Sequence, residues 1–377
     1  MGVGGPGAVF WMVVAGFLGM SSKFVECTLG QKYRVLRADG RISGGPMHYL
    51  SDGLAEMGLG GLGRFLAVVF AVMCIGGSFG GGNMYQSNQA FAQVAKTFAE
   101  SAPWLGSDAG AVAFGLLLAL AVGTVIIGGI KRIGEVASVL VPVMCIIYVA
   151  SGLLILAINA AAVPAAIGIV VREAFSFQAG LGGFVGVLIQ GFRRAAFSNE
   201  AGVGSAAIAH SAAQTDEPVR EGLVALLEPF IDTIIVCAMT GAVIVVTGAH
   251  AHPDAGTGIQ MTSFAFATVF PWFPIVLSIT AVAFAFSTMI SWSYYGEQCW
   301  VQLFGLRSVL LYKLIFLLFT WAGAIFAAEA VVEFGDLMIL GMAFPNIAGI
   351  LLLTGRVKAD LDDYMRRLAA GEFQKQS

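Results

Sequence analysis

The sequence predicts an all-α integral membrane protein with about nine transmembrane helices, and three observations lead to this fold class. Hydrophobic residues make up 58% of the 377 positions and charged residues only 11%, whereas soluble domains carry about 25% charged residues. The mean hydropathy is +0.85, so a lipid bilayer must solvate much of the chain. The apolar runs are continuous, which favours helices over the alternating segments of about 10 residues in a transmembrane barrel.

Nine segments reach the length of about 20 mainly apolar residues that a membrane span requires. They cover about residues 6–29, 62–94, 111–130, 136–160, 181–208, 219–246, 272–304, 309–328 and 337–353. We assign all of them to one transmembrane domain, residues 1–377, which ends in a tail at 356–377. Several segments are longer than a bilayer requires, which indicates helices that are tilted or broken.

The orientation follows from lysine and arginine, which accumulate in the cytoplasmic loops of membrane proteins. With the N-terminus outside, the opposite loops hold only Lys96 and Arg172. The cytoplasmic loops and tail then hold Lys32, Arg34, Arg37, Arg41, Arg64, Lys131, Arg132, Arg220, Arg307, Arg356, Lys358, Arg366, Arg367 and Lys375. We predict a multi-pass protein of the cell (inner) membrane with a cytoplasmic C-terminus. A chain that begins outside also leads us to expect that the natural protein has a further N-terminal part.

Composition and motifs disfavour several other classes of protein. No basic patch with interleaved aromatic residues is present, so nucleic acid is not an expected partner. The five cysteines lie in apolar segments without a C-x-x-C pair, so we expect no disulfide, metal site or cofactor. No phosphate-binding G-x-x-x-x-G-K-[ST] motif occurs, which argues against ATP-driven transport. No H-E-x-x-H motif and no pair of intramembrane aspartates occurs either, so we do not expect a membrane-embedded enzyme. The four histidines lie in predicted loops or at span ends: His48, His210, His250 and His252.

The second span contains a glycine cluster, residues 76–82, followed by Asn83 and Gln86. Small residues let transmembrane helices approach closely, so a close helix crossing is one interpretation. The other is that Asn83 and Gln86 face a polar cavity at membrane depth. The sequence leaves both open.

The fifth span carries the strongest local signal. Arg193, Arg194 and Glu200 lie within an apolar stretch, where each charge costs about 2.5–3.5 kcal/mol on insertion. Gly202 and Gly204 each weaken a helix by about 1 kcal/mol. An unwound stretch at membrane depth is tolerated where it lines a cavity, and secondary transporters bind substrates at such breaks. The alternative is two shorter segments that meet in a surface loop.

The seventh span places hydroxyl groups on one helical face. Ser287, Ser291 and Tyr294 follow each other at spacings of four and three, which puts them side by side. Hydroxyl oxygens suit a hard cation such as sodium. The alternative is that these serines bond the carbonyl of their own preceding turn.

These segments resemble the alanine or glycine:cation symporter family, the sodium:alanine symporters. The resemblance runs from residue 4 to about residue 355, and its most specific motif is Phe-Ser-Asn-Glu-Ala-Gly-Val-Gly-Ser at 197–205. Other matching motifs are Gly-Gly-Pro-Gly-Ala at 4–8, Gly-Gly-Pro-Met at 44–47, Gly-Asn-Met-x-Gln at 82–86, Phe-Ile-Asp-Thr at 230–233 and Trp-Ser-Tyr-Tyr-Gly-Glu at 292–297.

The resemblance implies a LeuT-like inverted-repeat transporter bundle, built from two repeats of five helices. The family's first core helix carries Gly-Thr-Gly-Asn-Ile-Ala-Gly shortly before Gly-Gly-Pro-Gly-Ala. That motif does not occur here, because Met1 lies only three residues before Gly4. The resemblance therefore implies an N-terminally truncated bundle that lacks its first core helix.

The function that the resemblance implies is sodium-coupled symport of alanine or glycine by alternating access. The implied substrate-binding residues are Asn83, Gln86, Phe197, Ser198, Asn199, Gly202, Gly204 and Trp292. The implied sodium ligands are Phe284, Ser287 and Thr288, and the candidate gate residues are Arg193, Arg194 and Glu200. Two alternatives stay open: a transport-incompetent remnant of such a symporter, and a proton-coupled carrier that uses Glu200 or Asp232.

Overall fold

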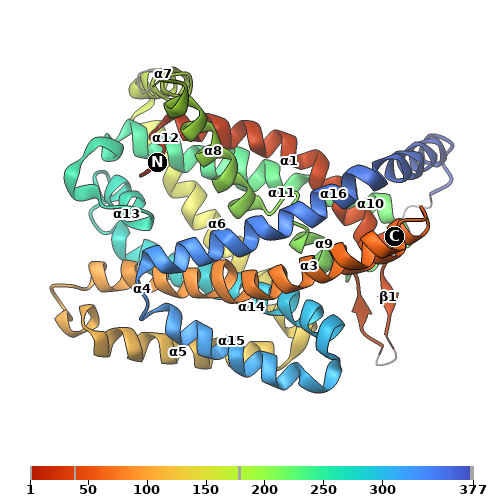
Figure 1. Ribbon diagram of the computed structural model, residues 1–377. Helices are drawn as coiled ribbons and strands as arrows, with labels where there is room; N and C mark the ends of the chain where they lie inside the picture. Colours follow the sequence, from red (N-terminus) through yellow and green to blue (C-terminus); the bar gives the residue numbers. More distant parts are fainter. Residues whose placement is uncertain (1, 38–39, 177–179, 374–377) are drawn as a thin grey trace.

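The structure is a computed structural model that describes residues 2–37, 40–176 and 180–373, and these residues form a bundle of long α-helices (Figure 1). Two strands of two residues each, β1 (Val35–Leu36) and β2 (Ile42–Ser43), pair in antiparallel register and form a short hairpin. The helices are α1 (Gly7–Lys32), α2 (Pro46–His48), α3 (Gly60–Phe79), α4 (Tyr85–Thr97), α5 (Asp108–Ile126), α6 (Gly129–Ile158), α7 (Val163–Ala174), α8 (Gly180–Asn199), α9 (Ser205–His210), α10 (Pro218–Ala225), α11 (Leu227–Pro229), α12 (Ala238–Val246), α13 (Ile259–Ala267), α14 (Phe273–Phe304), α15 (Val309–Gly323) and α16 (Ala328–Ala369).

Among the described residues, eight helical segments are long and apolar enough to cross a membrane. They are Gly7–Lys32, Gly60–Thr97, Asp108–Ile126, Gly129–Ile158, Pro218–Val246, Phe273–Phe304, Leu306–Gly323 and Ala328–Ala369. The prediction of an all-α membrane protein is confirmed. Each of these segments overlaps one of the nine predicted spans, and the predicted span without a counterpart is 181–208.

The helix over that predicted span is interrupted. It ends as α8 at Asn199 and resumes as α9 at Ser205. Between these ends, Glu200, Gly202 and Gly204 have φ angles of 56°, 77° and 94°. Left-handed backbone cannot continue a right-handed helix, so the chain must leave the helical path here. A second irregularity lies between α3 and α4, where residues Gly80–Met84 form a π-helical turn.

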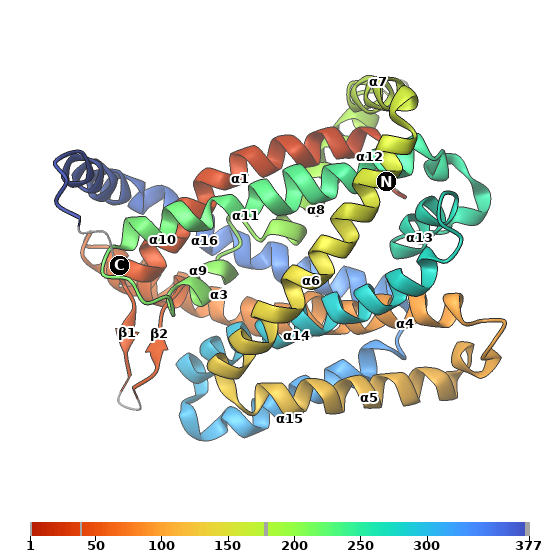
Figure 2. The same cartoon turned by 180° about the vertical axis from the view of Figure 1, so that it is seen from behind.

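The bundle packs α1 against α8, α9 and α10, and α3 against α14 and α16. From behind, α6 crosses α14 (Figure 2). The glycine cluster at the end of α3 and in the following π-helical turn allows close contacts, because a β-carbon at Gly76 would collide with Met338 of α16 and one at Gly82 with Trp292 of α14. For these glycines the interpretation as a close helix crossing is confirmed.

Ion pairs join distant parts of the chain at the end of the bundle where the β1–β2 hairpin and the end of α16 lie (Figure 1). Lys32 at the end of α1 pairs with Asp360 of α16 at 2.6 Å, and Arg367 pairs with Glu217 at 2.7 Å. Residues 356–369, which we predicted as part of a tail, continue α16 without interruption. This helix of 42 residues contains Pro345 near its middle.

Candidate functional site

The interrupted helix borders a cavity of about 480 Å³, which we call the break cavity. Helices α1, α6, α8, α9, α11 and α14 contribute to its wall. Seven of its lining residues are predicted site residues: Ser198, Asn199, Glu200, Phe284, Ser287, Thr288 and Trp292. The break therefore faces a cavity, as the first interpretation of this span requires, and is not an exposed surface loop.

Polar contacts fix the end of α8 beside the break cavity. The Ser198 hydroxyl donates to the Asp232 carboxylate at 2.5 Å. The amide of Asn199 donates to the Thr233 hydroxyl at 2.8 Å, and its carbonyl oxygen accepts from the backbone N–H of Ala201 at 3.0 Å. Asp232 and Thr233 lie in a π-helical segment, Phe230–Cys237, which brings both side chains toward α8.

Glu200 is the one non-glycine residue with a positive φ among the described residues. Its carboxylate accepts a hydrogen bond from the Trp292 indole at 2.9 Å and another from the Ser205 hydroxyl. These two bonds tie the break to α14 and to the start of α9. A left-handed glutamate is strained, and strain of this kind persists only where the surroundings enforce it.

The three candidate gate residues do not act as one group. Arg193 and Arg194 both pair with the buried Asp336 of α16, at 2.6 and 2.5 Å, whereas Glu200 faces the break cavity. The sequence offered no partner for the arginines, because Asp336 lies 142 residues from Arg194. Only the fold brings α8 and α16 together.

The other side of the break packs against α16. The amide of the buried Asn346 donates to the Gly202 carbonyl at 2.9 Å and to the Glu26 carboxylate at 2.8 Å, and its oxygen accepts from the Tyr49 hydroxyl. Gly204 faces Phe70 with no room for a β-carbon. Gly202 and Gly204 do not line the break cavity, and their role is to allow the left-handed backbone of the break.

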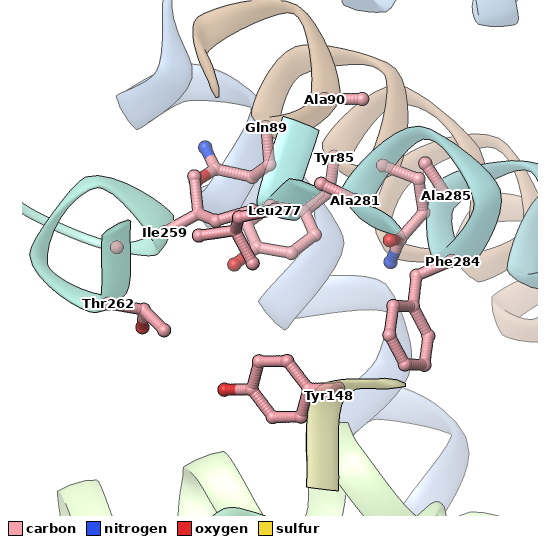
Figure 3. Close-up of a pocket in the computed structure, with 12 residues that line it drawn as sticks. Tyr85, Gln89, Ala90, Tyr148, Ile259, Thr262, Leu277, Ala281, Phe284 and Ala285 are labelled. Carbon is pink, nitrogen blue, oxygen red and sulfur yellow. The ribbon is translucent and has the colours of Figure 1, made fainter. Parts of the chain in front are cut away.

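A second cavity of about 320 Å³ lies between α4, α6, α13 and α14 (Figure 3). Gln86, Gln89 and Thr262 give it polar walls. Tyr148 and Phe284 line both cavities, with ring centroids 6.4 Å apart and nearly perpendicular planes. Because the two cavities share these two lining residues, we call this pair the aromatic partition.

The remaining predicted substrate residues lie outside the break cavity. Asn83 is fully buried, and its amide donates to the Phe316 carbonyl at 2.7 Å. Gln86 lines the second cavity and donates to the Gly81 carbonyl at 3.1 Å. The Phe197 ring meets Tyr85 edge-on, 5.2 Å between centroids. Of the two side chains predicted to face a polar cavity in the second span, Gln86 does so and Asn83 does not.

Some hydroxyl groups of α14 bond carbonyls of their own helix, and one of them is a candidate cation ligand at the break cavity. Ser287 donates to the Phe284 carbonyl and Ser291 to the Ser287 carbonyl, both at 3.0 Å, as the alternative interpretation of this span describes. The Thr288 side chain lines the break cavity, as does Asp232. Hydroxyl, carbonyl and carboxylate oxygens are the ligands that hard cations take in proteins.

Lys23 and Glu228 also line the break cavity, and our sequence reasoning missed both. A signal was available for Lys23, because it lies with Glu26 inside the first predicted span, where charges are costly and mark functional positions. Tyr148 gave no comparable signal, since a single tyrosine in an apolar span is typical of ordinary packing.

Comparisons of the sequence with known proteins point to one family. The sodium:alanine symporter family matches residues 1–377. The sodium/alanine symporter AgcS of Methanococcus maripaludis is 41% identical over 361 residues, which cover 95% of this chain and 77% of AgcS. Bacillus subtilis has two further relatives at 33% identity. One is the probable sodium/glutamine symporter GlnT (374 residues, 98% of this chain and 74% of GlnT), and the other, YrbD (386 residues, 98% and 76%), carries a name that describes a sodium/proton-dependent alanine carrier.

Proposed function

The chain belongs to the sodium:alanine symporter family, and from that premise we propose that it carries alanine or glycine together with sodium across the cell membrane. Amino-acid:cation symport agrees with the names of its relatives. The observation that carries the proposal is the break between α8 and α9 at the wall of the break cavity.

The break offers what a small amino acid requires. A helix that ends at membrane depth beside a cavity is the feature with which secondary transporters bind the charged groups of an amino acid, and α8 ends at the wall of the break cavity. Ser198 and Asn199 add side-chain hydrogen-bonding groups on the same wall, and Trp292 supplies an apolar surface for a small side chain. In our proposal, Glu200 orients Trp292 through their hydrogen bond.

Sodium would bind on the α14 side of the break cavity. We assign it to the Thr288 hydroxyl together with the backbone around Phe284 and Ser287, with the Asp232 carboxylate nearby in the same cavity. The Ser287 hydroxyl already donates to the Phe284 carbonyl, and a hydroxyl oxygen keeps lone pairs for a cation while it donates.

Alternating access follows from the two cavities and the aromatic partition. We infer a LeuT-like arrangement in which the break cavity and the second cavity open toward opposite sides of the membrane. Because the end with the hairpin carries the basic clusters, we place it in the cytoplasm and the end with α7 and α13 outside. The ion pairs of Arg193 and Arg194 with Asp336 then lie toward the outer side.

The sodium gradient supplies enough free energy for this work. One charge moved across 100 mV yields about 2.3 kcal/mol, and a tenfold sodium gradient yields about 1.4 kcal/mol. Together they allow a substrate to accumulate several-hundred-fold, at about 1.4 kcal/mol per tenfold.

The test is alanine uptake into proteoliposomes with an inward sodium gradient, compared with an equal potassium gradient. We expect uptake only with sodium. Thr288→Val should raise the sodium concentration for half-maximal uptake, whereas Thr280→Val should not, since the Thr280 hydroxyl bonds only carbonyls of its own helix. Equal uptake in both gradients would refute sodium coupling, and uptake in neither would favour a transport-incompetent chain.

Proton coupling is the second candidate, supported by carboxylates at the break cavity. Both Glu200 and Asp232 line it, and the name of the relative YrbD includes proton dependence. Uptake driven by a proton gradient without sodium, and lost in Asp232→Asn, would establish this candidate in place of the first.

A further inference from the structure

Lys23 of α1 places a buried ammonium group beside the break. Its side chain is 2% exposed, and the residue lies within an apolar segment that is long enough to cross a membrane. The ammonium nitrogen lies 2.8 Å from the backbone carbonyl oxygen of Asn199, the last residue of α8, and 2.8 Å from the Glu228 carboxylate. Lys23, Asn199 and Glu228 all line the break cavity.

Further polar contacts hold this arrangement in place. The second oxygen of Glu228 lies 2.9 Å from His210 Nε2, and His210 Nδ1 lies 2.6 Å from Glu221. The chain of contacts therefore joins α1, the end of α8, α9, α10 and α11. Four of its members line the cavity: Lys23, Asn199, His210 and Glu228.

The contact with Asn199 has a simple electrostatic basis. The last carbonyl groups of a helix lack hydrogen-bond partners within it and carry a partial negative charge. Helix α8 has 20 residues and ends inside the membrane bundle, where water cannot solvate that charge freely. A fixed cation at the last carbonyl offsets it, and the Glu228 carboxylate offsets the lysine in turn.

We propose that Lys23 is a positioning residue for the substrate site: its ammonium group, held by Glu228, fixes the carbonyl end of α8 in the orientation that the substrate requires. This inference rests on the proposed function, since it concerns the same cavity. It assigns to α1 a role that the resemblance to known symporters did not give it.

The variant Lys23→Ala tests the proposal by chemical rescue. Removing the side chain beyond the β-carbon leaves a space the size of n-propylammonium beside the cavity. We expect the KM of the variant for alanine to rise about tenfold or more, because a charge-assisted hydrogen bond is lost. Adding n-propylammonium to the assay should lower the KM of the variant again by at least threefold. The matched control is Lys32→Ala on the same helix, where the lysine pairs with Asp360 at the bundle end.

Each outcome decides the question. An unchanged KM in Lys23→Ala, or a rise that propylammonium does not reverse, overturns the proposal. If Lys23→Ala does not fold, Glu228→Gln replaces it, and a KM within twofold of the original chain overturns the proposal. If the unmodified chain transports nothing, the proposed function fails, and the thermal unfolding midpoint tests this inference separately. Propylammonium must then raise the midpoint of Lys23→Ala and leave the midpoint of the unmodified chain unchanged.

Discussion

Replacing Asp336 with asparagine removes the one carboxylate that holds both Arg193 and Arg194. The Asp336 side chain is 3% exposed, and the two arginine side chains are 33% and 34% exposed. Asparagine keeps the size of the side chain and one acceptor oxygen, so the change isolates the charge. The variant therefore measures how strongly α8 is held to α16.

The burial of these side chains determines how much the free energy of unfolding should fall in Asp336→Asn. Two hydrogen bonds to a charged group are each worth about 1.5–3 kcal/mol, and a broken buried ion pair costs about 3–5 kcal/mol. Water can solvate the arginines again, because about a third of each side chain is already exposed. We therefore expect the free energy of unfolding to fall by about 2–3 kcal/mol, between these limits and the near-zero value of exposed pairs.

The assay combines unfolding in detergent with a labelling measurement. A cysteine at Thr262, in the second cavity, should react with a membrane-impermeant maleimide at least tenfold faster in Asp336→Asn, since about 1.4 kcal/mol corresponds to tenfold. Glu333→Gln is the control, because it removes an exposed carboxylate from the same helix. Unchanged unfolding and labelling in Asp336→Asn would show that these ion pairs hold nothing together.

Three further changes have defined outcomes. Gly82→Ala should destabilise the protein by about 1–3 kcal/mol, because its β-carbon would overlap the indole ring of α14, whereas Gly61→Ala, with open space around it, should not, as unfolding curves would reveal. Tyr148→Ala should let sodium leak through the chain without alanine by joining the two cavities, whereas Tyr148→Phe keeps the ring and should stay tight in flux assays. Hydrogen bonds from Arg367 lower the pKa of the Glu217 carboxyl, so this pairing stabilises the fold above the usual carboxyl pKa and is lost as the pH falls through the lowered value. Proteolysis of the C-terminal helix should accordingly increase on acidification in the unmodified chain, whereas in Glu217→Gln it should be raised already at neutral pH and match the unmodified chain at low pH.

Local chemistry made part of this structure predictable. Continuous apolar runs predicted the long helices, and two glycines beside charged residues predicted the break after Asn199, because both features are costly inside a membrane helix. The seven predicted residues that line the break cavity come from two such segments. The resemblance to the symporter family implied six of these seven as binding residues, and Glu200 was singled out as a charge within the fifth predicted span.

Long-range pairing was not predictable. The contact of Lys23 with Asn199 spans 176 positions, and nothing near either residue identifies the other. Asn83 shows the opposite failure, since an amide near a glycine cluster suits a cavity and a helix contact equally, and only the position of Phe316 decides between them.

Pro345 divides α16 into two parts that can tilt relative to each other. Pro345 has no N–H to bond the preceding turn, so the helix bends most easily there. Asp336 lies nine residues earlier, about 13.5 Å along the axis, so a tilt of about 5° at the proline moves it by about 1.2 Å. That displacement is sufficient to separate both arginines from the carboxylate. Because Asn346, next to Pro345, bonds the Gly202 carbonyl, a shift of the unwound backbone around a bound molecule would tilt α16 and move Asp336 relative to Arg193 and Arg194.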